Sequence, residues 1–502
     1  MLKKITGILI ILSVLIILAA CGDTENVGGP ENNTAAGENN QGDTVNNDAA
    51  EDNQAGDTRP ASVLPGEKDF AGREFRVLRQ ARDVEQLYHL FIVEEMNGEP
   101  INDSLLERNS RIEEKYNIKF VQSDINDPSA TIRNTVRAGD NAYELMIDII
   151  RNTANLGAQS MLLDLYNAPY ISESLALNNP WWCKSLTQDL AINNTLYFQT
   201  GDLLMFDKLR LAIVYFNKDM FQTLGYDYPY QMVHDGTWTI DRLAEFTRGV
   251  NQDLNGDGIM DQYDQWGFMS QHAASFHFFA GAGLRTITLD NDGVPEITMS
   301  SPRALDVIQK VLAFCTEPEG MFHADTIRGA ANVWTQASAY FQENRFALRS
   351  SVFEPIVRDL RAMETDFGIL PFPKFNEAQE NYYSAVDPWG WVVALPNNAD
   401  PDFAGFIAEA LAYESGDTLM PAFYDLTLLT KTARDDESED MLDIIFNGKV
   451  YDIGEIFDIG GLTGLFSTLV SSGSMDFVSR FESVEPRAQT ALERFIDTYD
   501  AD

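Results

Sequence analysis

The chain has 502 residues, of which 44% are hydrophobic and 23% are charged, and its formal net charge is -41 at pH 7. This length exceeds one ordinary hydrophobic core, so two lobes or domains are expected. The negative charge argues against nucleic-acid binding, which needs a basic surface.

The first residues have the parts of an export signal. Lys3 and Lys4 precede an apolar run that reaches Ala20, and such a charged start, short apolar run and small residues are typical of a secretory signal. The run falls short of the roughly 20 apolar residues that a spanning helix needs. It ends in Leu-Ala-Ala-Cys, which resembles a bacterial lipobox. We therefore predict that residues 1–20 are removed and that Cys21 carries a lipid.

The next segment, residues 21–68, is predicted to be a disordered acidic tether. From Gly22 to Ser62 it consists mainly of Asn, Asp, Glu, Gly and Ala, with no aromatic residue. Such a segment cannot bury enough apolar area to offset the entropy of the chain. Its natural use is to hold a folded body away from a membrane.

A parallel α/β lobe is predicted after the tether. The expected elements are a strand Arg73–Arg79, a helix Asn102–Tyr116, a strand Ile118–Val121, a helix Ala130–Arg137 and a strand Tyr143–Ile150. Strands that alternate with helices indicate a parallel sheet. The last strand is almost continuously apolar, as expected when helices cover both faces of a sheet.

Two arginines stand at strand ends in this lobe. Ligands of parallel sheets gather at the carboxyl ends of the strands, so Arg79 and Arg151 are candidate ligand-binding residues, although either could be an ordinary surface arginine. In the helix between the first two strands, Ser104 and Glu107 have the spacing of a capping box.

The middle of the chain is predicted to form a second lobe. The apolar segment Asp202–Asn217 is expected to carry the first crossing between the lobes. The elements expected after it are a helix Ile240–Val250 capped by Thr239, a helix Arg303–Phe314 that starts after Pro302, two helical or mixed segments, Ala339–Arg349 and Phe353–Met363, and a short strand, Phe367–Pro373.

An acidic loop in the second lobe has the spacing of a calcium-binding loop. Oxygen ligands at positions one, three, five, seven, nine and twelve suit Ca²⁺, and a glycine at position six allows the sharp turn. Gly258 holds position six, and the last position has an aspartate in place of the usual glutamate. The alternative is an acidic surface turn. The predicted ligands are Asp253, Asn255, Asp257, the Ile259 carbonyl, Asp261 and Asp264.

Signals of catalysis are scarce. The five histidines form no HExxH pattern, and there is no GxSxG, Walker or GxGxxG motif. His272 and His277 have the wrong spacing for two helical metal ligands and are interpreted as packing or rim residues. A carboxylate pair of a glycosidase cannot be recognised among so many acids. Beyond the lipobox only Cys183 and Cys315 are present, which allows at most one bridge between them.

The segment Ser384–Pro396 is predicted to return the chain to the first lobe. It contains two tryptophans around a glycine and then a strand. Aromatic rings with polar rims suit sugars or planar ligands in a cleft, so Asp387, Trp389 and Trp391 are candidate ligand-binding residues. The lobes predicted from these crossings are residues 69–203 with 388–430, and residues 204–387 with 431–502.

At this point the residues resemble a family, the extracellular solute-binding lipoproteins of ABC importers (family 1, the carbohydrate-binding cluster of Gram-positive bacteria). The resemblance covers nearly the whole mature body. It rests on the lipobox, SLLERNSRIEEKYNIKF, GTWTIDRLAEFTRGVNQDLNGDGIMDQYDQWGF, SAYFQENRFALRSS, FGILPFPKFNEAQENYYS and FAGFIAEALAYES.

This resemblance implies a fold and a function. The fold is α/β, a two-lobe periplasmic-binding-protein-like (type II) fold with crossing hinge strands, which closes on its ligand without catalysis. In related sugar binders the segment matching Ala347–Phe353 supplies a cleft aromatic residue, which nominates Phe353. The family's usual aspartate–lysine pair after the first strand is absent, which leaves the sugar class open.

The combined interpretation is a monomeric, lipid-anchored receptor on the outer face of the cell membrane. It is expected to deliver a carbohydrate, specifically an oligosaccharide, to ABC permease subunits, with Ca²⁺ as a structural ion. Three alternatives stay open: a receptor for a peptide or another polar solute, an exported glycoside hydrolase, and a surface sensor or adhesion protein without a transporter.

Overall fold

The computed structural model describes residues 59–81, 86–317, 320–360, 363–429 and 436–499. Apart from Arg59 they belong to one compact unit, Pro60–Asp502. The predicted signal peptide, Cys21 and most of the predicted tether lie outside the described residues. Within the described residues, no helix has both the length and the apolar character needed to cross a membrane.

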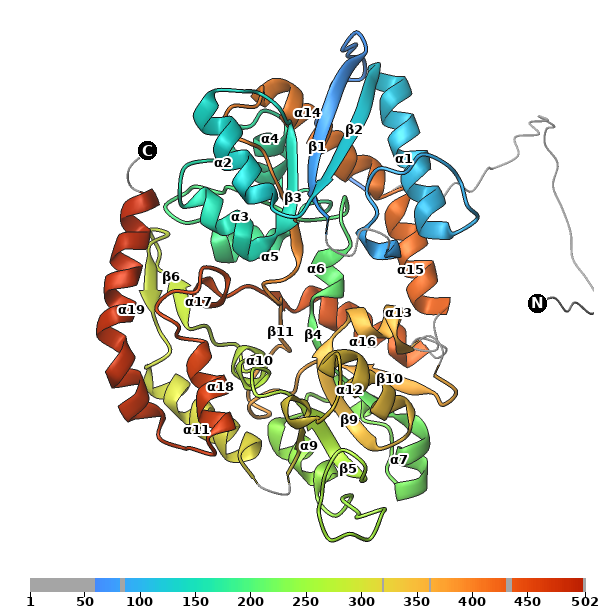
Figure 1. Ribbon diagram of the computed structural model, residues 1–502, viewed down its shortest axis with the longest axis vertical. Coiled ribbons are helices and arrows are strands. Elements are labelled where there is room, and N and C mark those ends of the chain that lie inside the picture. The colour runs from blue at the N-terminus through green and yellow to red at the C-terminus, as the bar shows by residue number, and fades with distance from the viewer. Residues whose placement is uncertain (1–58, 82–85, 318–319, 361–362, 430–435, 500–502) are drawn as a thin grey trace, which may run out of the picture. The chain divides into compact units, whose positions relative to one another are not determined.

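The first sheet has four strands and contains the amino-terminal part of the described chain (Figure 1). Strand β1 pairs in parallel with β2 and β3, and β12 pairs with β3 in the antiparallel direction. All five residues of β3 are buried, because helices α2 and α3 pack on this strand. The order is β12-β3-β1-β2, with bounds Trp391–Ala394, Leu145–Ile149, Arg73–Gln80 and Ile118–Ile125.

The helices of this first lobe begin with well-defined caps. The side chain of Glu99 accepts a hydrogen bond from the backbone of Asn102, and that of Asp127 accepts one from Ala130. A proline follows each cap, where its missing N–H costs nothing. The helices are α1 (Pro100–Tyr116), α2 (Pro128–Ala138), α3 (Ile150–Gly157), α4 (Ile171–Ala176), α5 (Lys184–Leu190), α14 (Pro401–Ser415) and α15 (Leu419–Leu429).

The second sheet has five strands in the order β10-β4-β9-β5-β8. Strands β9, β5 and β8 run parallel, whereas β4 is antiparallel to both of its neighbours. Each sheet therefore contains one antiparallel strand that enters from the other lobe. The bounds are Phe367–Leu370, Ala212–Asn217, Phe346–Val352, Trp266–Ser270 and Phe322–His323.

Helices from two parts of the chain belong with this second sheet. The side chain of Thr239 caps α9 by accepting a hydrogen bond from the backbone of Arg242, at 3.4 Å. Helix α16, from the later part of the chain, contacts β10. The helices are α7 (Lys218–Leu224), α8 (Tyr230–His234), α9 (Ile240–Thr247), α10 (Ser275–Gly281), α11 (Pro302–Cys315), α12 (Val333–Gln342), α13 (Glu354–Arg358), α16 (Asp436–Asn447), α17 (Ile453–Ile456), α18 (Gly464–Ser471) and α19 (Phe477–Tyr499). Short strands β6 (Ile287–Leu289) and β7 (Pro295–Ile297) form a separate hairpin.

Two connections between the sheets run side by side. The first passes through α6 (Phe206–Leu209) into β4, and the second runs from β11 (Ser384–Ala385) into β12. Leu211 and Val386 form an antiparallel bridge between the two connections. A third connection, from α15 to α16, includes residues 430–435, which lie outside the described residues. This arrangement confirms the predicted two-lobe α/β fold with crossing strands.

Buried charges hold the two crossings together. Asp207 of α6 accepts hydrogen bonds from Lys208, at 3.1 Å, and from Lys449, at 2.5 Å. Lys449 lies on β13 (Lys449–Val450), which pairs with β11. Burial lowers the pKa of Lys208, but the carboxylates of Asp207 and Asp202 outweigh this effect and raise the pKa.

Several local predictions differ from the structure. The capping box is wrong, because α1 begins at Pro100 and Ser104 donates instead to the Ile101 carbonyl inside the helix. The segment Ala339–Arg349 is split between the end of α12 and the strand β9. Cys183 and Cys315 are both free and buried, so they form no disulfide bond with each other.

Candidate functional site

The turn between β11 and β12 organises the candidate site. Asp387 accepts a hydrogen bond from the Trp389 backbone at 2.8 Å, and its carbonyl accepts one from Gly390 at 3.1 Å. The Asp387 amide donates to the Arg210 carbonyl on the other crossing at 2.9 Å. These bonds hold the Trp389 ring, which is 46% exposed, on the surface of the crossing.

Charged residues from other elements surround this turn. Arg151, at the start of α3, donates from its backbone to the Pro388 carbonyl at 3.4 Å. Its guanidinium pairs with Glu455 of α17 at 3.4 Å, and Arg210 pairs with Glu354 of α13 at 2.8 Å. We call the set Arg151, Arg210, His277, Asp387, Trp389 and Glu455 the crossing site.

The charge of Asp387 influences the pKa of His277 and of Glu455. Burial lowers the pKa of His277, and Asp387 partly opposes this effect. Burial also raises the pKa of Glu455, where Arg151 acts in the opposite direction and Asp387 adds to the rise. The crossing site therefore combines carboxylates, guanidinium groups and an imidazole that burial keeps neutral.

Three nitrogen atoms in the crossing site have no hydrogen-bond partner within the described part of the chain. They are Nε of Arg151, Nε of Arg210 and Nδ1 of His277, and each is buried. Buried polar groups are nearly always paired, so such atoms need an explanation. A bound solute with hydroxyl or carbonyl groups would supply the missing partners.

The other candidate residues lie beneath the crossing site or outside it. Trp391 is 3% exposed and stacks on Phe206 at 4.9 Å. Arg79 is buried and pairs with Asp124 at 2.7 Å, while its guanidinium lies 6.0 Å from the Trp391 ring. Phe353 is fully buried against Phe446. The structure therefore brings Arg151, Asp387 and Trp389 together and places Arg79, Phe353 and Trp391 in the core.

Sequence reasoning missed Arg210 and Glu455 and interpreted His277 as a packing or rim residue. Arg210 had a usable signal, because it interrupts the apolar segment that was expected to cross between the lobes. Glu455 had none, since α17 is a single turn and approaches α3 only through the tertiary fold.

The acidic loop is closed by its own hydrogen bonds. Asp253 accepts from the backbones of Gly256 and Gly258 at 2.7 and 2.8 Å, and these bonds lower its pKa. Gly258 has a φ of 77°, which side chains disfavour. Buried Asp264 accepts from the backbones of Leu254 and Asp261 at 2.9 and 2.8 Å.

The predicted calcium ligands are four carboxylates, one amide and one backbone carbonyl of the acidic loop. Among the described residues, no group of three or more His, Cys, Asp or Glu side chains is placed to hold a metal ion. A carboxylate oxygen that accepts one N–H keeps another lone pair for a cation. The loop thus has suitable oxygen chemistry, and the calcium site stays a prediction.

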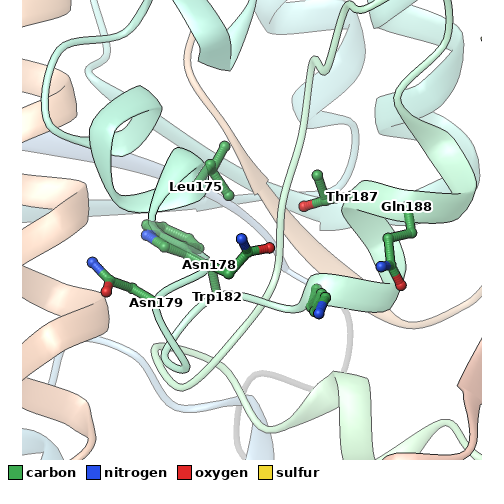
Figure 2. Close-up of a pocket in the computed structure, with 7 residues that line it drawn as sticks. Leu175, Asn178, Asn179, Trp182, Thr187 and Gln188 are labelled. Atoms are coloured by element: carbon green, nitrogen blue, oxygen red, sulfur yellow. The ribbon is translucent and has the colours of Figure 1, made fainter. Parts of the chain in front are cut away.

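A small hollow lies between α4 and α5, and Figure 2 shows the residues that line it. Its volume is about 30 Å³, which suits ordered water and is too small for a sugar ring. The hollow is lined by Leu175, Asn178, Asn179, Trp182, Lys184, Thr187 and Gln188.

A buried carboxylate stands beside this hollow. Glu409 of α14 is fully buried and accepts hydrogen bonds from the indole N–H groups of Trp181 and Trp182 at 2.8 and 2.7 Å. In the described part of the chain it forms no ion pair. Burial raises the pKa of Glu409 to about 7, although the bonds from both indoles lower it.

Comparison with solved structures identifies the fold. An ABC substrate-binding protein from Listeria monocytogenes in complex with cycloalternan aligns with a TM-score of 0.50 and 11% identity, over 86% of this chain and 99% of the other. A cyclo/maltodextrin-binding protein complexed with maltotetraose gives 0.54 and 13%, over 86% and 97%. A sugar transporter from Rhizobium etli in an open conformation gives 0.53 and 12%, over 86% and 99%.

These neighbours are transport binding proteins and not enzymes. No protein-family model matches the chain, and no curated protein sequence matches it. At such low identity the likeness concerns the fold alone. The chain therefore has the two-lobe α/β fold of the sugar-binding proteins of ABC transporters.

Proposed function

We propose that this protein is the lipid-anchored solute-binding component of an ABC importer and that it captures a carbohydrate, specifically an oligosaccharide, at the crossing site. The observation that carries the proposal is the set of three buried, unpartnered nitrogen atoms beside the exposed Trp389 ring. The three nitrogen atoms and the Trp389 ring belong to residues from α3, the two crossings and α10.

The chemistry of the crossing site favours a polyhydroxylated solute. A hydroxyl group both donates and accepts, so it can pair with the nitrogen atoms of Arg151 and Arg210 and also with the Asp387 and Glu455 carboxylates. The exposed indole offers an apolar face of the kind that suits a sugar ring. A simple anion would pair with the arginines but would be repelled by the two carboxylates.

Ligand-dependent stability tests this proposal. The purified protein is heated with a panel of mono- and oligosaccharides and peptides, and a ligand at a hundredfold over its Kd should stabilise it by about 2.7 kcal/mol. Trp389→Ala should abolish the shift. Trp334→Ala is the matched control, because Trp334 lies on α12 and is 44% exposed, and it should leave the shift intact.

The outcomes separate the alternatives. A shift with peptides alone would favour a peptide receptor, and release of reducing ends during incubation would favour a glycoside hydrolase. If a carbohydrate still stabilises the Trp389→Ala variant, the solute binds at another site. Tight binding without turnover supports the proposal.

Two further parts of the proposal concern the chain outside the crossing site. The lipobox motivates lipid attachment at Cys21, which would place the protein on the outer face of the cell membrane beside its permease subunits. The spacing of the acidic loop motivates a structural Ca²⁺ ion held by Asp253, Asn255, Asp257, Ile259, Asp261 and Asp264.

A further inference from the structure

A larger hollow lies at the outer edge of the second sheet. Its volume is about 250 Å³, and its walls come from the acidic loop, the start of β5 and the edge strand β8. Two strands, β9 and β5, separate β8 from the crossing strand β4. We call this space the Gln262 hollow, and it shares no residue with the crossing site.

Gln262 contributes a carboxamide to the wall of the hollow. The residue is 4% exposed and lines the hollow, and its carboxamide makes no hydrogen bond with any residue that the structure describes. A carboxamide can donate two hydrogen bonds and accept two. A molecule bound in the hollow could supply these hydrogen-bond partners.

An orphan polar atom belongs to His323. Its Nε2 lies 3.0 Å from the Cys315 carbonyl, which can only accept, so Nε2 carries the hydrogen and Nδ1 is left as an acceptor. Nδ1 is buried and has no partner within the described ranges. Burial lowers the pKa of His323, which favours this neutral form.

The rest of the hollow combines apolar side chains with Asp261, Thr326 and Arg328. Met321 and Phe322 are buried at 4% and 5% exposure, and the Phe322 ring lies 5.6 Å from the Trp266 ring. Met260, from the acidic loop, is 37% exposed. Arg328 is exposed and forms no ion pair with the described residues.

We infer that the Gln262 hollow is a second binding site, for a small uncharged polyhydroxylated ligand of about the size of a monosaccharide. Hydroxyl groups can donate to His323 Nδ1 and to the Gln262 oxygen, and they can accept from the Gln262 amide and from Arg328. An apolar face of the ligand rests on Met260 and Phe322. A neutral ligand fits because Asp261 and Arg328 both line the hollow.

Titration of single variants with monosaccharides tests this inference. Glucose, galactose, mannose and xylose are titrated at millimolar concentration into the protein without its predicted signal, with binding followed by saturation-transfer NMR. At least one sugar should bind. Gln262→Leu should weaken its binding by about tenfold or more, the equivalent of one lost hydrogen-bonded pair. Arg328→Ala should weaken it less.

The melting temperature of the ligand-free variants provides an independent readout. Gln262→Leu should leave it close to the wild-type value, because the Gln262 carboxamide makes no hydrogen bond with the described residues. Gln265→Leu is the matched control: Gln265 donates to the Val250 carbonyl at 2.8 Å, so its replacement should lower the melting temperature. A Gln262→Leu protein that melts lower than wild type would show a structural role and overturn the inference.

Two other results would also overturn it: no monosaccharide in the panel binds, or binding is unchanged in Gln262→Leu. The inference stands apart from the proposed function. If Trp389→Ala changes no binding while Gln262→Leu does, the crossing-site proposal fails and the second site remains. If the reverse is found, only the crossing site remains.

Discussion

Asp387 shows how one short side chain arranges the crossing site. Its carboxylate accepts a hydrogen bond from the Trp389 backbone amide. Its own amide donates to the Arg210 carbonyl, and its carbonyl accepts from the Gly390 amide. The same carboxylate influences the pKa of His277 and of Glu455. A residue in this position links the shape of the turn to the charge balance of the site, so a substitution of Asp387 would change both.

Glu409 predicts a specific pH dependence of stability. Burial raises its pKa from 4.5 to about 7, so between these values the folded protein keeps a proton that the unfolded chain has released. The contribution of Glu409 to the free energy of unfolding is complete below pH 4.5 and is lost as the pH rises through 7. Its size is about 3 kcal/mol. Urea unfolding measured between pH 4.5 and 8 checks this decline.

Glu409→Gln is the matched variant for this measurement. The NH₂ group of a glutamine cannot accept a hydrogen bond from the second indole, whereas both oxygens of the protonated carboxyl group can accept, so the variant should be less stable by about 1–3 kcal/mol at low pH. Since a glutamine does not titrate, the stability difference between wild type and variant should shrink as the pH rises. A difference that is constant with pH would contradict the raised pKa.

Part of the crossing site could be predicted from the sequence. Arg151, Asp387 and Trp389 stand where a strand or a crossing ends, and strand order alone brings such positions together. Their role in solute binding stays a prediction. Burial could not be read in the same way: Arg79 also stands at a strand end, but Asp124 on the neighbouring strand neutralises it in the core.

At the scale of elements, the acidic loop is a short segment that satisfies its own polar groups. Its carboxylates cap backbone amides within the loop, and Trp266 donates to the Asp261 carbonyl at 2.9 Å. The loop leads directly into β5, so its order affects one side of the second sheet.

Calcium should raise the melting temperature of the protein, and a chelator should lower it. The physical reason is that an ion which binds only the folded loop stabilises the protein by mass action. Differential scanning calorimetry with CaCl₂ or EGTA measures the effect, with MgCl₂ as the ionic control. Equal melting temperatures in all three conditions would show that the loop is an ordinary hydrogen-bonded turn.

Most helices and strands could be predicted, and the misses have physical reasons. Pro302 and Thr239 mark helix starts because their chemistry suits only that position. Strand β9 follows α12 after the turn at Asn344, which has a φ of 59°. Its residues FALRSSV are all at least half-buried between β4 and β5, so tertiary pairing outweighs the local helical pattern.

At the scale of the whole molecule, the fold class was predictable because the order of elements repeats a simple rule. In each lobe, strands that alternate with helices form the parallel part of the sheet. One apolar segment that crosses from the other lobe adds the antiparallel strand. The third crossing, predicted after residue 430, falls between α15 and α16, at residues 430–435, which lie outside the described residues. The predicted lobe boundaries therefore stay a prediction.

The proposed lipid attachment at Cys21 concerns the location of the whole molecule, and Cys21→Ala tests it. The wild-type protein should fractionate with membranes and incorporate a labelled fatty acid, whereas the variant should be found in the medium and carry no label. A wild-type protein found in the medium without lipid would support a plain signal peptide instead.

The position of β12 has a consequence for the synthesis of the protein. The first sheet is incomplete until Trp391–Ala394 pairs with β3, which lies about 240 residues earlier in the chain. A ribosome therefore releases most of the second lobe before the first can close, and neither lobe exists as a contiguous gene fragment. Such distant pairing slows folding, so the nascent chain exposes apolar surface for an extended time, and chaperones have a long period in which to bind it.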